Sequence, residues 1–355
     1  MKCAREVPDN WLETLKKRIV QEKWKHHLLR RSAAQARAAK RFKGYRREKN
    51  FGHSRRARPR HDHFKKTSTL TAPQHFSLIE NPSEVIQFLN RMRILGRRQN
   101  IFVDMASITT LTTDGIAAFL AAIHHRDLAN ANIFGNVPRD VRLRQRLTES
   151  GFYEYVSGKS AGLHRVAMGA IRKRQHSGET FREEFNQFVA SDLIAFATER
   201  LRGAPGPHQP SYSVLGEAML NTVYHASASP DEREPWWASV FVDTERRRAC
   251  FTFIDQGVGI FKSHRLGLRL NLATHLRFTD RAEILRDLMH GKIPSSTKVP
   301  GRGNGIPGMY GHCKARRIRS LTVLANDAIG YAETEVYSVL NTSFDGTVLY
   351  WEIDA

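Results

Sequence analysis

Three polar residues recur at every fourth position in the stretch LGEAMLNTVYHA, residues 215–226: Glu217, Asn221 and His225. An α-helix turns about 100° per residue, so these side chains would form one stripe along a helix. The opposite stripe is apolar and consists of Leu215, Met219, Val223 and Ala226. A carboxylate can act as a general base, and an amide oxygen can bind a hard cation. The segment therefore predicts a helix with one packed face and one candidate site, although a solvated polar stripe gives the same pattern.

Glycines alternate with other residues in two stretches further along the chain. The stretch FIDQGVGI, residues 253–260, contains Asp255, Gly257 and Gly259, and the stretch GRGNGIPGMYG, residues 301–311, contains Gly301, Gly303 and Gly305. A third stretch, FDGTVLYW, places Gly346 and Thr347 at the head of an expected strand. Alternating glycines before a helix let backbone N–H groups converge on a phosphate, with help from the helix dipole. A helix is expected to begin near Ile306.

The four motifs occur in the order E-x-x-x-N-x-x-x-H, D-x-G-x-G-I, G-x-G-x-G and G-T. Together they resemble the ATP-binding domain shared by gyrase B, Hsp90, histidine kinases and MutL, the GHKL family. The likeness covers roughly residues 181–355 and is closest to the branch that contains the anti-sigma serine kinases. Hairpin pairs and helices expected over this range already indicate an α+β sandwich, in which a mixed sheet carries helices on one face. The resemblance implies an α/β sandwich of this kind, with ATP and Mg²⁺ as cofactors.

The resemblance assigns a role to each matching residue. Asn221 would coordinate Mg²⁺, and Glu217 would be the catalytic residue that orients and deprotonates water in the ATP-hydrolysing members. Asp255 would accept a hydrogen bond from the adenine amino group, with Thr347 supporting it or a nearby water. His225 would contact phosphate, or cap or pack the helix. The remaining cofactor-binding residues are glycines: Gly257 and Gly259 beside the base, and Gly301, Gly303 and Gly305 at the phosphates.

Residues 263–300 lie between the second and third motifs, where the resembled family has a mobile lid over ATP. Within and just after this segment, Lys298 or Arg302 would neutralise charge on the γ-phosphate, or would be ordinary exposed lid residues.

A separate α/β unit is expected over residues 70–158, where predicted helices and strands alternate. The stretches around residues 101–123 and 133–156 are similar to a STAS domain, the fold of anti-anti-sigma factors. Phosphorylatable members of that family have a serine before the glycine that opens a helix, whereas this chain has Asp114 before Gly115. An aspartate cannot accept phosphate from a serine kinase and already carries a negative charge. Thr112 and Thr113 are neighbours of the matching position.

Charge is concentrated in a basic arm, residues 1–66, which holds 22 Lys and Arg against 6 Asp and Glu within a chain of net charge +21. The arm is expected to be partly helical or disordered. Its charge suits the phosphates of nucleic acid or an anionic membrane, or simply keeps the chain soluble. Residues 159–180 mix Gly, Ser and charged residues and are expected to link the 70–158 unit to the ATP-binding domain over 181–355.

Composition points to a cytoplasmic protein, in keeping with a bacterial regulator. Cys3, Cys250 and Cys313 are scattered without metal-ligand spacing, which argues against zinc and disulfides. The longest apolar run, residues 115–123, is too short to cross a membrane, and the first residues lack a secretory signal pattern.

Three functions remain open from the sequence. The first is an ATP-binding regulatory protein that switches interactions of its STAS-like domain or of a protein partner, such as a sigma or anti-sigma-like regulator. The second is an anti-sigma-type serine/threonine protein kinase. The third is a nucleic-acid-binding adaptor in which ATP is structural and the basic arm makes non-specific contacts. The sequence argues against a sensor histidine kinase, because the pair of a histidine and an acidic residue ahead of the ATP-binding domain, His61 and Asp62, lies in the basic arm and not in an expected helix.

Overall fold

The computed structural model describes residues 67–128, 131–157, 164–170, 187–225, 235–263, 280–293 and 305–355. The chain from Phe64 to Ala355 forms one compact unit. The expectations for the basic arm and for Gly301, Gly303, Lys298 and Arg302 lie outside the described residues. We call residues 67–157 the small module and residues 164–355 the large module.

The small module is built on a parallel sheet in the order β1–β3–β5, comprising Thr67–Thr71, Asn100–Asp104 and Ile133–Gly135. Helices α2 (Pro82–Gly96) and α3 (Thr113–Ile123) follow β1 and β3, as parallel neighbours require a crossover. A two-stranded pair, a short 3₁₀ turn and two further helices complete it: β2 (His75–Phe76), β4 (Thr110–Leu111), η1 (Arg126–Leu128), α4 (Val141–Glu149) and α5 (Phe152–Ser157). The sequence predicted one helix over 139–156, but Gly151, with φ of +77°, separates α4 from α5.

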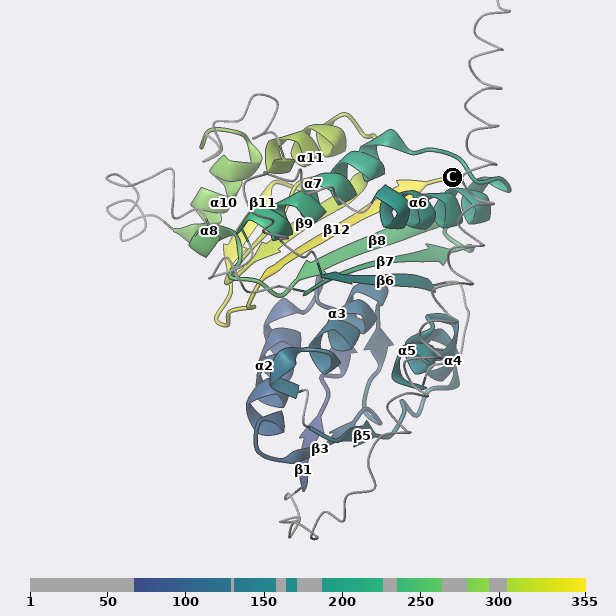
Figure 1. Ribbon diagram of the computed structural model, residues 1–355, viewed down its shortest axis with the longest axis vertical. Coiled ribbons are helices and arrows are strands. Elements are labelled where there is room, and N and C mark those ends of the chain that lie inside the picture. The colour runs from purple at the N-terminus through teal and green to yellow at the C-terminus, as the bar shows by residue number, and fades with distance from the viewer. Residues whose placement is uncertain are drawn as a thin grey trace, which may run out of the picture. The chain divides into compact units, whose positions relative to one another are not determined.

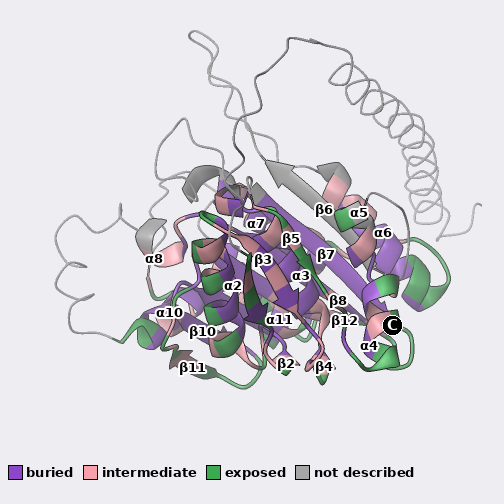
Figure 2. Ribbon diagram, turned by 90° about the horizontal axis from the view of Figure 1, so that it is seen from below, coloured by how far each residue is buried: buried purple, intermediate pink, exposed green. Residues whose placement is uncertain are grey.

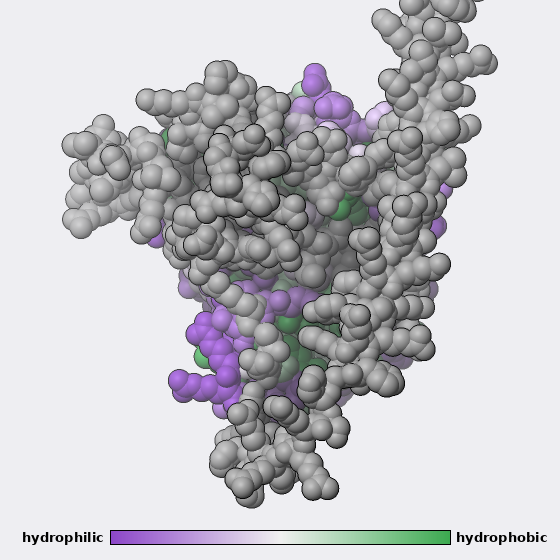
Figure 3. All heavy atoms as spheres, viewed as in Figure 1, coloured by the Kyte–Doolittle hydropathy of each residue, from purple (hydrophilic) through white to green (hydrophobic). Residues whose placement is uncertain are grey.

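The apolar spacing of α2 explains how it packs. Its buried residues recur at helical intervals and are Val85, Ile86, Phe88, Leu89 and Met92. Its other side carries the exposed Arg91, Arg97 and Arg98, the last two at its carboxyl end. Figure 3 shows strongly hydrophilic side chains on the side of the small module where Figure 1 places α2.

The large module contains a seven-stranded sheet in the order β11–β10–β9–β12–β8–β7–β6 (Figure 1). The strands are β6 (His164–Ala170), β7 (Pro235–Asp243), β8 (Arg248–Asp255), β9 (Arg319–Ala325), β10 (Ala328–Tyr331), β11 (Val336–Val339) and β12 (Thr347–Asp354). The four longest strands of residues 235–355 match the stretches where the sequence predicts strands, residues 236–243, 248–255, 319–326 and 344–353. Edge strand β6 lies inside the segment that the sequence assigned to a linker, residues 159–180.

The expectation of a mixed sheet was wrong, because all six pairings of the large sheet are antiparallel. Strands β8 and β9 run in the same direction and are joined through helices, which would make a parallel pair if they were neighbours. Strand β12 instead lies between them and pairs antiparallel with both over its length (Figure 1).

Four helices cover one face of the large sheet, as expected: α6 (Gln187–Arg202), α7 (Gln209–His225), α10 (Arg281–Met289) and α11 (Gly305–Lys314). A short helix, α8 (Ile260–Ser263), follows β8. Alternate residues of the strands, including Phe251, Phe253 and Trp351, form a core with the apolar sides of these helices. This helix-covered face is the one that positions the candidate site.

The opposite face of the large sheet is partly buried as well. Its outward residues at one end belong to the same apolar core as the small module and are Trp237, Ile254, Leu324, Ile329 and Val348. Helix α3 lies against β7 and β8 at this end. Helix α3 is covered by the large sheet on one side and by the small module on the other, so it is buried along most of its length (Figure 2). In the described parts of the chain, no helix has the length and apolar composition needed to span a membrane.

Candidate functional site

Helix α7 presents two of the predicted polar residues on the side away from its packed stripe. Leu215 and Met219 are fully buried in the core under the sheet. Glu217 and Asn221, one turn apart, are partly exposed. His225 is the last residue of α7, and its side chain lies outside the described residues. The predicted helix with a packed face and a polar face is therefore confirmed over residues 215–222.

Gly305 meets the polar face of α7 at the point where α11 begins. A Cβ atom built on Gly305 would lie 3.0 Å from Glu217 Oε2 and 3.5 Å from Asn221 Nδ2. The start of α11 is therefore packed closely against both side chains, with no room to spare for a larger residue. The first turn of a helix has unpaired N–H groups and the positive end of the helix dipole, which together favour a phosphate. Carboxylate, amide and helix start thus converge here.

Asp255 is the last residue of β8 and Thr347 is the first residue of β12, and the two lie side by side at this end of the large sheet. Their Cα positions are partners in the pairing of β8 with β12. Asp255 follows Phe251 and Phe253 at every second position, so strand alternation turns it toward the helix layer, and both polar residues are buried. The Asp255 carboxylate accepts a hydrogen bond of 3.0 Å from the Gly257 amide.

Gly346 makes this close approach possible. Its φ of +128° is a backbone conformation that side-chain-bearing residues rarely adopt, and a Cβ atom there would lie 2.0 Å from the Asp255 carbonyl oxygen. The G-T motif therefore has a steric reason: the glycine lets the turn before β12 pass directly over the end of β8. Sequence reasoning found the motif without this reason.

Two residues beside Asp255 were missed by sequence reasoning. Gln256 donates a 2.7 Å hydrogen bond from Nε2 to the Ala121 carbonyl of α3. Asn326, in the turn between β9 and β10, packs its amide beneath Gly259. Both are ordinary turn residues in the sequence, and the only signal for them is their position next to a motif residue or a strand end.

The expected lid is in part a core helix. Residues 281–289 form α10, capped by Asp280, which accepts a hydrogen bond from the Ala282 amide. Leu285 and Met289 are fully buried in the core shared with the sheet. The apolar spacing of this helix is itself visible in the sequence, but the family resemblance assigned it to the lid. The expectation of a lid over all of residues 263–300 was therefore wrong for α10.

Asp114 of the small module, which precedes Gly115 where the resembled family has a phosphorylatable serine, makes its contacts inside the protein. It is buried, and its Oδ2 accepts hydrogen bonds from the Leu78 and Ile79 amides at 2.7 and 3.0 Å and from the Ser77 hydroxyl. Burial raises the pKa of Asp114, although these hydrogen bonds oppose the shift. The carboxylate fastens the loop before α2 to the start of α3. Thr112 caps α3 by accepting from the Gly115 amide.

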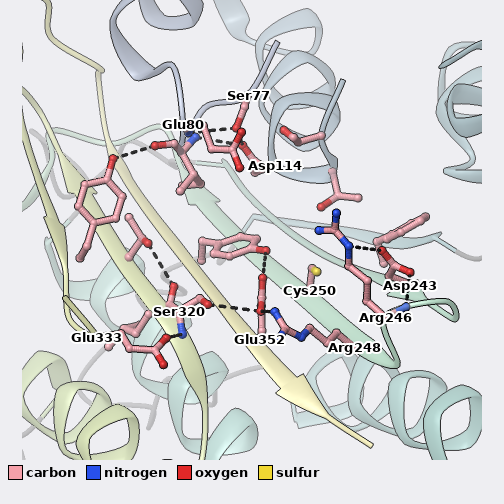
Figure 4. Close-up of a pocket in the computed structure, with 18 of the residues that line it drawn as sticks. Ser77, Glu80, Asp114, Asp243, Arg246, Arg248, Cys250, Ser320, Glu333 and Glu352 are labelled. Carbon is pink, nitrogen blue, oxygen red and sulfur yellow. Dashed lines mark hydrogen bonds and ion pairs between the residues drawn. The ribbon is translucent and has the colours of Figure 1, made fainter. Parts of the chain in front are cut away.

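A polar cavity of about 560 Å³ lies where the small module faces the polar end of the large sheet (Figure 4). Its walls carry both signs of charge, and five of the carboxylates there already have donors: Glu80, Asp114, Asp243, Glu333 and Glu352. Glu352, for example, accepts from the Arg248 guanidinium, the Ser320 hydroxyl and the Tyr350 hydroxyl. Burial raises the pKa of the Cys250 thiol in this cavity to about 12, so the thiol is neutral and a poor nucleophile.

The comparisons with known proteins give no family for this chain. No protein-family model matches it, and a search of curated proteins finds no significant match. Among the described residues, no group of three His, Cys, Asp or Glu side chains is arranged to hold a metal ion. The site on the helix-covered face therefore has to be interpreted from its own geometry.

Proposed function

We propose that this protein binds ATP with Mg²⁺ on the helix-covered face of the large sheet. The observation that carries the proposal is the approach of Gly305 to Glu217 and Asn221 on the same face of the sheet that bears Asp255. Phosphates would lie at the start of α11, where unpaired N–H groups and the dipole favour anions. Adenine would lie at Asp255, whose buried carboxylate is an acceptor for an exocyclic amine.

The residues at the phosphate end fit a magnesium-bound triphosphate. Asn221 would supply a neutral amide oxygen, a ligand that a hard cation accepts alongside phosphate oxygens. Mg²⁺, when bound, neutralises phosphate charge and holds the phosphates in one geometry. Because Gly305 has no side chain, a phosphate at the start of α11 would lie within reach of Glu217 and Asn221, whereas a Cβ atom there would crowd both side chains. Glu217 would orient a water molecule and take its proton.

We also propose that bound nucleotide regulates interactions of the small module or of a protein partner. The small module contacts the nucleobase end of the site, where Asp255 would bind adenine, at two places. Gln256, which lies between Asp255 and Gly257 in the sequence, donates a hydrogen bond to α3. The segment leading to Gly346 binds α2 through three contacts, Gln87 to Asn341, Asn90 to Ser343 and Arg93 to Asp345. A change in the position of either segment, the one around Gln256 or the one leading to Gly346, would therefore alter contacts with the small module. We accordingly prefer a nucleotide-dependent regulator as the function.

A measurement of ligand-induced stabilisation tests nucleotide binding. ATP with Mg²⁺ should raise the melting temperature of the wild-type chain, because a ligand that binds only the folded state stabilises it by mass action. The Asp255→Asn variant should show no rise, because an amide can no longer present two acceptors to the adenine amine. Absence of a shift for the wild-type chain at millimolar ATP would refute the proposal.

A radiolabel experiment separates the two chemistries that such a site can perform. With γ-labelled ATP, hydrolysis releases labelled inorganic phosphate, whereas a protein kinase of the anti-sigma type transfers the label to a co-purified protein. The position resembling a phosphorylated serine is the buried Asp114, so we expect no label at that position of this chain.

The basic arm, residues 1–66, remains a proposed contact for nucleic acid. Such contact should weaken steeply with salt and vanish when residues 1–66 are deleted, while ATP binding survives.

A further inference from the structure

Asn326 occupies an unusual position for a turn residue. It lies between β9 and β10, where hairpin turns are commonly exposed, yet only 2% of its surface is accessible. Its φ of +51° is in the left-handed region, which asparagine tolerates better than most residues with a side chain. The turn thus points a polar side chain into the molecule, at the nucleobase end of the candidate site.

The contacts of Asn326 join two separate segments. Its side-chain Nδ2 donates to the Val258 carbonyl at 3.1 Å and, more weakly, to the Phe344 carbonyl at 3.5 Å. Its backbone N–H donates to the Gly346 carbonyl, and its own carbonyl accepts from the Phe344 amide at 2.8 Å. One segment carries Gly257 and Gly259 and the other carries Gly346 and Thr347, so one buried residue fixes the distance between them.

The amide also determines the shape of the glycine loop. A Cβ atom on Gly259 would lie 2.4 Å from Asn326 Oδ1 and 2.5 Å from Nδ2, so the loop backbone rests directly on the amide plane. The orientation of this amide follows from its surroundings, because only the NH₂ group can bond to two carbonyl oxygens. Its Oδ1 is buried and has no hydrogen-bond partner among the described residues. Buried acceptors of this kind call for an explanation other than fold stability.

We propose that Asn326 is the positioning residue for the nucleobase end of the site. The inference rests on the proposed function, since it assigns the base to Asp255 and the glycine loop. Asn326 binds the Val258 carbonyl and so fixes the position of Gly257 and Gly259 relative to Asp255 and Thr347. It does not act on the phosphates, which belong to the start of α11. Its removal should therefore weaken recognition of the base and leave recognition of the triphosphate intact.

The test compares two variants of Asn326 with a matched control. Asn326→Gly keeps the left-handed turn and removes the amide, and Asn326→Asp keeps the shape but cannot donate to Val258. Asn132→Ala is the control, because the Asn132 amide donates within the small module, to Asn100 Oδ1 at 3.3 Å. Dissociation constants for Mg²⁺-ATP and for Mg²⁺-tripolyphosphate are measured by calorimetry, with hydrogen exchange at residues 257–259 as a second measurement.

Both Asn326 variants should lose about tenfold or more in ATP affinity, as expected for lost buried hydrogen bonds. Tripolyphosphate affinity should stay within about twofold, and exchange at residues 257–259 should rise in the variants only. Equal ATP affinity in wild type and Asn326→Asp would overturn the inference, and so would a parallel loss of both ligands. A wild-type chain that binds neither ligand would instead refute the proposed function. If Asn326→Gly does not fold, Asn326→Asp and its exchange pattern decide.

Discussion

Glu217 and Asn221 sit one turn apart on α7, so the site allows their roles to be separated by single substitutions. Glu217→Ala should retain ATP binding and lose about 10²–10⁴-fold in hydrolysis rate, because a general base acts only on the reacting water. Asn221→Ala should lose Mg²⁺-dependent affinity instead. Phosphate release and calorimetric binding measure the two effects. A wild-type hydrolysis rate in Glu217→Ala would show that Glu217 has no catalytic role and that the polar face of α7 is only its solvent-exposed side.

A steric argument at Gly346 gives a second prediction at this scale. Gly346→Ala should destabilise the fold by more than about 2 kcal/mol, because the new methyl group meets the Asp255 carbonyl and the backbone conformation is strained. Gly203→Ala is the control, since Gly203 also has a positive φ, +78°, but no atom of the described residues, its chain neighbours aside, lies within 4 Å of the added carbon. The control should cost only about 1 kcal/mol. Urea denaturation measures both, and equal costs would contradict the steric argument.

Glu335 provides a pH-dependent contribution to stability. It lies at φ of +57° before β11 and accepts hydrogen bonds from Tyr310, His290 and Tyr337 while pairing with Lys314. Partial burial would raise its pKa, but these donors outweigh burial and lower the pKa from 4.5 to about 2. A lowered pKa gives stability that is present above pH 4.5 and is lost as the pH falls toward 2.

Glu335→Gln should therefore reduce the loss of stability between pH 5 and pH 2, since the amide does not titrate over that range. Urea midpoints of wild type and variant at several pH values measure the difference. The two curves should be furthest apart near neutral pH and converge near pH 2. A constant separation over the whole range would show that Glu335 contributes no titrating interaction.

At the scale of elements, α10 distinguishes a core helix from a lid. Leu285→Ala should cost about 2–5 kcal/mol, the usual range for a large aliphatic side chain removed from a packed core. Glu283→Ala, on the exposed side of the same helix, should change stability by less than about 0.5 kcal/mol. Chemical denaturation compares them. A negligible effect of Leu285→Ala would restore α10 to a lid.

The sequence predicted the long elements well and the short ones poorly. The runs of apolar and aromatic residues over 236–243 and 248–255, joined by a short polar turn, were enough to identify β7 and β8, which are buried along most of their length. Strands β10 and β11 have four residues each, too few for a period to be recognised. The mixed sheet was inferred from the order of expected strands and helices, but strand pairing depends on contacts between distant segments that no local pattern contains.

The candidate site divides in the same way. Glu217, Asn221 and Gly305 could be found because type and spacing within one element indicate their chemistry. Gln256 and Asn326 could not, because their importance comes from what lies across the fold: α3 for Gln256 and the glycine loop for Asn326. Asp114 was singled out for its negative charge, but its structural contacts could not be foreseen, since the amides of residues 78 and 79 that donate to it precede it by about 35 residues.

At the scale of the whole molecule, the shared apolar core predicts that the two modules unfold together. Leu120→Ala in α3 removes a fully buried side chain of the core that also contains Trp237 and Ile254 of the large sheet. In a chain starting at residue 64, every tryptophan belongs to the large module, at positions 236, 237 and 351. Leu120→Ala should lower the free energy of unfolding by about 2–5 kcal/mol. Tryptophan fluorescence and circular dichroism should report the same decrease, because the two modules unfold in one transition.

The control for this prediction is Val141→Ala, because Val141 is 65% exposed on the small module and should have no measurable effect. If Leu120→Ala moved only the circular dichroism transition, the modules would be independent folding units and contact between them would add no stability. Such a result would also remove the physical basis for communication between the small module and the nucleobase end.

The position of β12 has a consequence for the order in which the molecule assembles. It is the last strand along the chain and yet lies at the centre of the large sheet, between β8 and β9. Until it inserts, the sheet consists of two halves, and β8 and β9 each present an open edge of unpaired N–H and C=O groups. Pairing β12 with β8 joins residues about 100 positions apart, as in the partners Thr347 and Asp255 at one end and Asp354 and Arg248 at the other. Such distant pairing makes folding slow. The late-arriving strand therefore sets the period during which a growing chain is exposed to edge-to-edge aggregation, and chaperone dependence should concentrate in that interval.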